Sequence, residues 1–212
     1  RASPRSVPGG DPLCAGNCQT LVADPKGKFL FAATATGLAV IEIENDGNLL
    51  IVGGSPFGPA VRLNGLTVVR KGKVFRVYGV DIVNGTIVAW DIDKRTGTAT
   101  SAGVSYAIGT AGGPVGIWAG KKYLYAVNQT DATVYGFVID KRNGALSPVP
   151  SSPTSFPGIT SPTNVTVDRK ERVLVVNDLG GGYGYADIRK GTGELQGATS
   201  VTSPSMATAV IG

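Results

Sequence analysis

Histidine is absent from this 212-residue sequence, and there are only two cysteines and one methionine. Without histidine the chain lacks Ser-His-Asp and Cys-His arrangements, imidazole acid–base catalysis and histidine-ligated zinc. No apolar run approaches the roughly 18 residues of a membrane helix, so no membrane span is expected. Charged residues make up only 17% of the chain, and 31 glycines and 13 prolines interrupt it. Such a chain is too apolar to be disordered and too interrupted to be helical.

The two cysteines lie close together in "CAGNC". We predict a Cys14–Cys18 disulfide; the alternative is two unpaired thiols in an N-terminal segment. A CxxxC pair without histidine is a poor zinc site, because structural zinc usually takes four N or S ligands. Asn84, Asn128 and Asn164 begin glycosylation sequons. Together with a first residue that is not Met, these features favour an extracellular or periplasmic protein with an oxidised cysteine pair.

The sequence repeats itself four times. The clearest segment of each copy is an apolar run preceded by Lys or Arg, and the four runs follow Lys28, Lys73, Lys122 and Arg172, at spacings of 45, 49 and 50 residues. Another apolar run precedes each of these, a third follows, and a turn containing glycine comes next: "NDGN", "DKRTG", "DKRNG" and "RKGTG". Alternation of apolar residues and β-branched enrichment predict three strands per copy, with a weaker fourth after the turn.

Four antiparallel strands every 45 to 50 residues are the unit of a β-propeller blade. A lone meander of this kind leaves both faces apolar, and stacking blades around an axis buries them. We therefore predict an all-β propeller over residues 19–212, after an N-terminal extension over 1–18. The alternative is a β-sandwich, which does not call for regular copies. The predicted blades span 19–58, 59–110, 111–158 and 159–203, with the first strand of a fifth at 204–212.

Three segments, "ADPKGKFLF" (23–31), "GGSPFG" (53–58) and "LYAVN" (124–128), resemble the repeat of lactonase-type propellers, the 6-phosphogluconolactonase-like and YVTN-repeat proteins. The resemblance covers residues 19–205. It implies a propeller fold, and it leaves activity open because many such repeats are not enzymes. The family usually closes seven blades with well over three hundred residues. We therefore expect a part of a longer protein; a second chain completing the ring and an unusually small ring are the alternatives.

The two ends of the predicted propeller differ in charge. Its turn end carries the turns between strands one and two and between strands three and four; its linker end carries the other turns and the blade-to-blade linkers. Sixteen of the 20 basic residues fall on the turn end: Lys26, Lys28, Arg70, Lys71, Lys73, Lys94, Arg95, Lys121, Lys122, Lys141, Arg142, Arg169, Lys170, Arg172, Arg189 and Lys190. This charge either steers the turn end toward an acidic polymer or anionic surface, or simply keeps tight turns soluble. These turns lack interleaved aromatic residues, which argues against nucleic acid.

The linker end carries polar side chains at equivalent places in copies two to four. We predict that they surround the channel mouth and hold a small polar ligand, or more weakly Ca²⁺, through converging oxygens; no other cofactor is expected. Each is also explained singly by turn chemistry, because Asn and Asp bond the local backbone. The candidates are Arg62, Asp81, Asn84, Asn128, Asp131, Asn177 and Asp178.

Two functions follow as hypotheses. The first is a secreted binding or scaffold module whose linker end docks a small polar ligand or a protein partner. The second is a lactonase-like or muconate-cyclase-like enzyme, as the resemblance implies. Relatives of that kind use His, Arg and Glu near the channel, and the His has no match here. Asp81 or Asp178 as a base with Arg62 as oxyanion partner are the nearest candidates. Trp90 and Trp118 lie on predicted strands, where packing between blades is expected.

Overall fold

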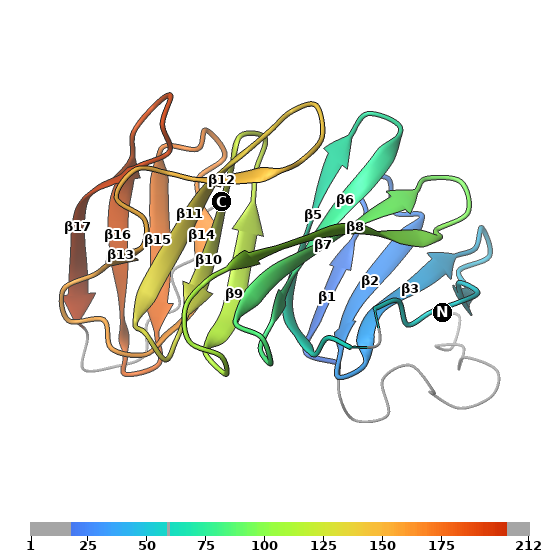
Figure 1. Ribbon diagram of the computed structural model, residues 1–212, viewed down its shortest axis with the longest axis horizontal. Coiled ribbons are helices and arrows are strands. Elements are labelled where there is room, and N and C mark those ends of the chain that lie inside the picture. Colours follow the sequence, from blue (N-terminus) through green and yellow to red (C-terminus); the bar gives the residue numbers. More distant parts are fainter. Residues whose placement is uncertain (1–17, 59, 203–212) are drawn as a thin grey trace.

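The structure is a computed structural model that describes residues 18–58 and 60–202. Within these residues it contains seventeen strands and no helix. The strands form four antiparallel sheets that follow one another along the chain and stand side by side (Figure 1). The predicted all-β propeller architecture is confirmed, and the sandwich alternative is wrong. Cys14 of the predicted disulfide and the strand predicted at 204–212 lie outside the described residues, as does nearly all of the extension over 1–18.

Each sheet is one copy of the repeat, with its strands in sequential order. The first sheet contains β1 (Thr20–Ala23), β2 (Phe29–Thr34), β3 (Gly37–Ile43) and β4 (Leu49–Ile51). The second contains β5 (Leu63–Lys71), β6 (Val74–Asp81), β7 (Thr86–Asp93) and β8 (Ala99–Ala107). The third contains β9 (Pro114–Ala119), β10 (Tyr123–Asn128), β11 (Thr133–Ile139), β12 (Leu146–Pro148) and β13 (Thr154–Ser155). The fourth contains β14 (Pro162–Val167), β15 (Val173–Asp178), β16 (Gly182–Ile188) and β17 (Leu195–Thr202).

The apolar residues gather in three clusters, one between each pair of neighbouring sheets. Successive side chains of a strand point to opposite faces, so the second strand of a sheet contributes to two clusters. In β10, Tyr123 and Tyr125 face the fourth sheet, whereas Leu124 and Ala126 face the second. The first strands β1, β5, β9 and β14 are neighbours along the inner edge of the array. Burial on both faces explains why the middle strands are almost continuously apolar.

The outer strands of the first and third sheets are short, and serine side chains complete them. The backbone N–H of Val40 donates to Ser55 Oγ at 2.8 Å, and that of Gly136 donates to Ser152 Oγ at 2.9 Å. These serines lie in the Ser-Pro segments after β4 and β12. A hydroxyl thus satisfies a β3 or β11 amide that an outer strand would otherwise pair.

A repeated contact joins each sheet to the next. The turn between the third and fourth strands carries a glycine that packs against the second strand of the preceding sheet. Gly97 faces Phe29, Gly144 faces Arg76 and Tyr78, and Gly193 faces Tyr123. All three glycines are buried and have a positive φ, of +74°, +68° and +77°. A side chain at these positions would meet both an unfavourable backbone conformation and a neighbouring blade.

Candidate functional site

At the linker end, Asp81 ties the turn after β6 to the linker before β5. Its side chain is fully buried. One carboxylate oxygen accepts the backbone N–H groups of Val83 at 3.0 Å and Arg62 at 3.4 Å, and the other accepts the Asn84 amide at 2.6 Å. The structure therefore brings Asp81 and Asn84 into direct contact. The Arg62 side chain is exposed and forms no ion pair among the described residues.

Asn128 plays the corresponding part in the third sheet. It is fully buried, and its amide donates to the carbonyls of Ile108 at 2.7 Å and Thr110 at 3.0 Å. Its Oδ1 accepts the backbone N–H of Asp131, whose carboxylate accepts the N–H of Thr110 at 2.8 Å. Asn128 and Asp131 are thus brought together by a turn that holds the preceding linker. Glycosylation of the three sequons stays a prediction; at Asn128 the sugar would replace one of the two amide hydrogens that donate to Ile108 and Thr110.

Asp178 has the same position in the repeat as Asp81, but its carboxylate accepts fewer hydrogen bonds. One of its oxygens accepts the backbone N–H of Ser161 at 2.6 Å, and within the described chain the other oxygen accepts no hydrogen bond. Asn177 precedes it, and its carbonyl accepts the Thr163 hydroxyl at 3.4 Å. Asn164 is exposed on β14. In residues 18–58 and 60–202, no three His, Cys, Asp or Glu residues lie close enough to hold a metal ion, and a calcium site stays untested.

The turn end holds a cleft of about 1070 Å³ between the second, third and fourth sheets. Its walls come from the turns after the inner strands β5, β9 and β14 and from the turn after β11. Two carboxylates, Asp140 and Glu171, line it together with seven cationic side chains: Arg70, Lys71, Lys121, Lys122, Lys141, Arg169 and Lys170. All seven belong to the basic turn end that the sequence predicts.

Neither carboxylate neutralises the cleft cations by pairing with them. Asp140 accepts the backbone N–H groups of Arg142 at 2.7 Å and Asn143 at 3.2 Å, and these bonds lower its pKa. Glu171 accepts the backbone N–H of Lys121. In the described part of the chain, Lys71 is the one cleft cation with an ion pair, to Asp91 at 3.4 Å. The cleft consequently has an excess of unpaired positive charge.

Trp118 also lines the cleft, which its position in a strand does not reveal. It lies near the end of β9, half-buried, and stacks on Tyr125 with ring centres 6.4 Å apart and planes inclined at 28°. The expected packing role is therefore accompanied by access to a cavity. Trp90, by contrast, is buried in the cluster between the first two sheets, as predicted.

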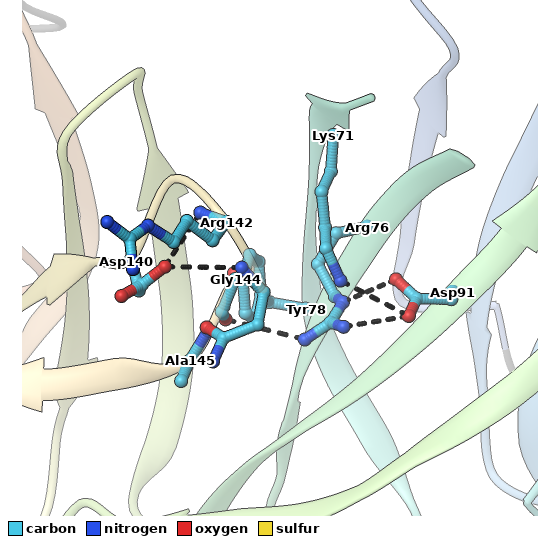
Figure 2. Close-up of polar contacts among 9 residues, drawn as sticks. Lys71, Arg76, Tyr78, Asp91, Asp140, Arg142, Gly144 and Ala145 are labelled. Atoms are coloured by element: carbon cyan, nitrogen blue, oxygen red, sulfur yellow. Dashed lines mark hydrogen bonds and ion pairs between the residues drawn. The ribbon is translucent and has the colours of Figure 1, made fainter. Parts of the chain in front are cut away.

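A buried ion pair supports the wall of the cleft (Figure 2). Arg76 of β6 is only 4% exposed, and its guanidinium binds both carboxylate oxygens of Asp91 of β7, at 2.7 and 2.8 Å. The same guanidinium donates to the Gly144 carbonyl at 3.4 Å, and the Tyr78 hydroxyl donates to that carbonyl at 2.7 Å. The second and third sheets are therefore joined by hydrogen bonds from Arg76 and Tyr78. At the next joint Tyr125 donates to the Gly193 carbonyl at 2.7 Å, and the Tyr123 hydroxyl accepts the Gly191 N–H at 3.1 Å.

The pKa values of this network follow from burial and charge. Burial opposes the charged carboxylate of Asp91, but the hydrogen bonds and positive charges of Arg76 and Lys71 outweigh it and lower the Asp91 pKa. Burial raises the pKa of Tyr78 to about 12, against the opposing charge of Arg76. At neutral pH the pair is therefore ionised, and the tyrosine remains a hydrogen-bond donor.

Asp168 fixes the turn that carries Arg169 and Lys170 into the cleft. Its carboxylate accepts the backbone N–H groups of Val173 at 2.9 Å and Lys170 at 3.3 Å. Burial disfavours its charge, but backbone N–H groups and the Arg172 side chain outweigh this and lower the Asp168 pKa from 3.8 to about 2. A carboxylate with a depressed pKa in the folded state adds stability above its unfolded pKa, and this stability is lost as the pH falls through the folded pKa.

We therefore predict an acid-dependent effect of Asp168→Asn. The parent should lose unfolding free energy between about pH 4 and pH 2, and the variant should lose less over that window because it has no carboxylate to protonate. Urea unfolding at several pH values within the window measures both slopes. Equal slopes for the parent and the variant would contradict this role of Asp168.

The four sheets are antiparallel meanders, and their first strands lie side by side along the inner edge. This is the arrangement of blades in a β-propeller, here with two chemically different ends. A family model described as lactonase, 7-bladed β-propeller matches residues 80–206, and the chain belongs to this family. None of the curated proteins matches the chain.

Solved structures share the fold. A periplasmic gluconolactonase from Pseudomonas aeruginosa superimposes with a TM-score of 0.72 at 17% identity, over 87% of this chain and 53% of its own. A putative 6-phosphogluconolactonase from Bacteroides fragilis gives 0.71 at 22% identity, over 91% and 56%, and one from Bacteroides uniformis gives 0.68 at 15%, over 84% and 55%. The chain thus spans a little over half the length of these neighbours.

Proposed function

We propose that this chain is part of a lactonase-type propeller that hydrolyses a small lactone at its linker end. The observation that carries the proposal is the family match over residues 80–206, which runs through the three turns that hold Asp81, Asp131 and Asp178. Neighbours named gluconolactonase and 6-phosphogluconolactonase support a sugar lactone as the substrate class. An extracytoplasmic location belongs to the proposal, since one neighbour is periplasmic.

Among the linker-end groups, Asp178 and Arg62 are best suited to the chemistry. Asp178 keeps one carboxylate oxygen without a hydrogen bond among the described residues, and Arg62 keeps an exposed guanidinium. Asp81 is a poor base because it is buried and both its oxygens already accept hydrogen bonds.

The proposed step begins when Asp178 takes a proton from water as the water oxygen attacks the lactone carbonyl. Arg62 donates to the carbonyl oxygen as negative charge develops there. The ring C–O bond then breaks, and the proton passes from Asp178 to the departing alkoxide. The product is the open-chain hydroxy acid.

Hydrolysis of glucono-lactone and 6-phosphoglucono-lactone, followed by acid release at constant pH, tests this function. We expect Asp178→Asn and Arg62→Ala each to lower kcat/KM at least tenfold, a factor worth about 1.4 kcal/mol. Asp187→Asn and Arg95→Ala remove an exposed carboxylate and an exposed guanidinium outside the linker end, and should leave the rate unchanged. Absence of hydrolysis above the spontaneous rate, or equal rates in all variants, would exclude the enzyme and leave the linker end as a docking surface.

A further inference from the structure

We propose that the turn-end cleft binds an acidic oligosaccharide, at a site separate from the linker end. The cleft has a volume of about 1070 Å³, at the upper end of the several hundred to about a thousand Å³ typical of ligand pockets. A single small anion would fill little of it. Its cations come from four different turns, so the positive charge surrounds the cavity and suits a ligand with several separated negative groups.

The cleft cations are available to a ligand. Arg70, Lys122, Lys141 and Lys170 are exposed and form no ion pair or side-chain hydrogen bond within residues 18–58 and 60–202. The backbones that carry them are nevertheless fixed. Lys170 lies in the turn whose backbone N–H groups donate to the Asp168 carboxylate. The Glu171 side chain accepts the backbone N–H of Lys121 and so holds the turn after β9, across the cleft. Binding would therefore order long side chains but not the loops beneath them, which lowers its entropic cost.

Apolar side chains also line the cleft, which favours a sugar over a bare polyanion. Val68, Ala119, Ile139 and Val167 line it together with the cations, as does the half-buried indole of Trp118. A sugar ring presents one C–H face that can pack on an indole, while its carboxylate or sulfate groups reach the cations.

Two other polyanions fit the cleft less well. A groove for single-stranded nucleic acid stacks successive bases on several aromatic rings, whereas Trp118 is the one aromatic residue that lines this cleft in the described chain. A membrane-binding surface presents protruding apolar side chains. The large apolar residues that are exposed in residues 18–58 and 60–202, such as Leu21, Val104 and Tyr185, do not line the cleft.

Calorimetric titration of the 212-residue chain with a heparin-derived hexasaccharide and with tetragalacturonic acid tests the proposal, with maltohexaose as the neutral probe. We expect the acidic probes to bind, with affinity falling linearly on a log–log plot against salt. Lys122→Glu with Lys170→Glu should weaken binding at least tenfold. The matched control, Arg95→Glu with Lys190→Glu, makes the same change in net charge at exposed turn-end sites outside the cleft, and should change affinity less than twofold.

Trp118 supplies an independent readout. In a Trp90→Phe background the remaining tryptophan is Trp118, and its fluorescence should change when an acidic oligosaccharide saturates the cleft. Binding that is weakened equally by both charge pairs, an unchanged Trp118 signal, tighter binding of single-stranded RNA or anionic vesicles, or no binding of the acidic probes would each overturn the proposal. Lactone hydrolysis in the Lys122→Glu, Lys170→Glu variant should match the parent, so failure here is distinguishable from failure of the proposed enzyme.

Discussion

Replacing Asp91 with alanine is expected to lower the free energy of unfolding by about 3 kcal/mol, because removing one partner of a buried ion pair leaves an uncompensated charge. Arg76 is 4% exposed and lies in a strand that is buried on both faces, so its guanidinium has little access to water. After the change, the Gly144 carbonyl at 3.4 Å would be its one remaining partner among the described residues. The estimate lies at the lower end of the usual range because Asp91 itself is partly exposed.

The double variant Arg76→Met, Asp91→Ala separates loss of the pair from loss of packing. Replacing a buried pair with apolar residues is often neutral, so the double variant should be more stable than Asp91→Ala alone. Urea unfolding followed by tryptophan fluorescence measures both. If Asp91→Ala costs no more than removal of the exposed carboxylate in Asp187→Ala, the pair between β6 and β7 adds no more stability than an exposed carboxylate does.

Gly193→Ala is expected to be about as damaging, with a loss of about 3 kcal/mol, for two reasons that add. The φ of +77° costs an L-residue about 1–2 kcal/mol. The new Cβ would also lie 2.5 Å from the Tyr123 ring and 3.1 Å from Val149. Tyr123 is buried and its hydroxyl accepts the Gly191 N–H at 3.1 Å, so the ring has little room to move.

Gly191 in the same turn provides the matched control. Its φ is +96°, but a Cβ there meets no atom within 4 Å. Gly191→Ala should therefore carry the backbone cost alone, about 1–2 kcal/mol, and melt at a clearly higher temperature than Gly193→Ala. Equal melting temperatures for the two variants would show that the contact between blades contributes nothing, and that only the turn conformation needs glycine.

The fold was predictable because the repeat leaves three local marks: alternating apolar runs, Asp- or Asn-containing turns, and glycine after the third strand. Asp93 and Asp140 show why these marks are reliable, since each accepts two backbone N–H groups of its own turn. The outer strands of the first and third sheets were harder to predict. Their amides are satisfied by Ser55 and Ser152, which lie beyond the strands in irregular segments.

The candidate sites were only partly predictable because their partners are distant in the sequence. Turn chemistry predicts Asp81 and Asn128 as polar turn residues, but their contacts with Arg62 and Ile108 depend on the linker that precedes each sheet packing beside them. Arg76 does carry a mark, a charge within an apolar strand. The register that aligns Lys73 with Lys28 and Lys122 places Val74 beside Phe29 and Tyr123. In the structure Arg76 is the residue that faces the turn glycine in their place, so a charge replaces an aromatic ring and requires a partner.

Trp118 carries no such mark. Its strand position predicts packing, which the structure shows against Tyr125. That the same ring also reaches the cleft depends on four turns from three sheets meeting at the turn end of the array. Neither composition nor spacing predicts that meeting, although the basic turn end as a whole follows from counting charges by turn.

The two proposals together assign different ligands to the two ends of the array. A crystal structure of the chain grown with tetragalacturonic acid tests this assignment most directly. We expect density for the sugar in the turn-end cleft, with a ring against Trp118 and carboxylates near Lys122 and Lys170. Density at the linker end beside Arg62, with the cleft empty, would contradict it.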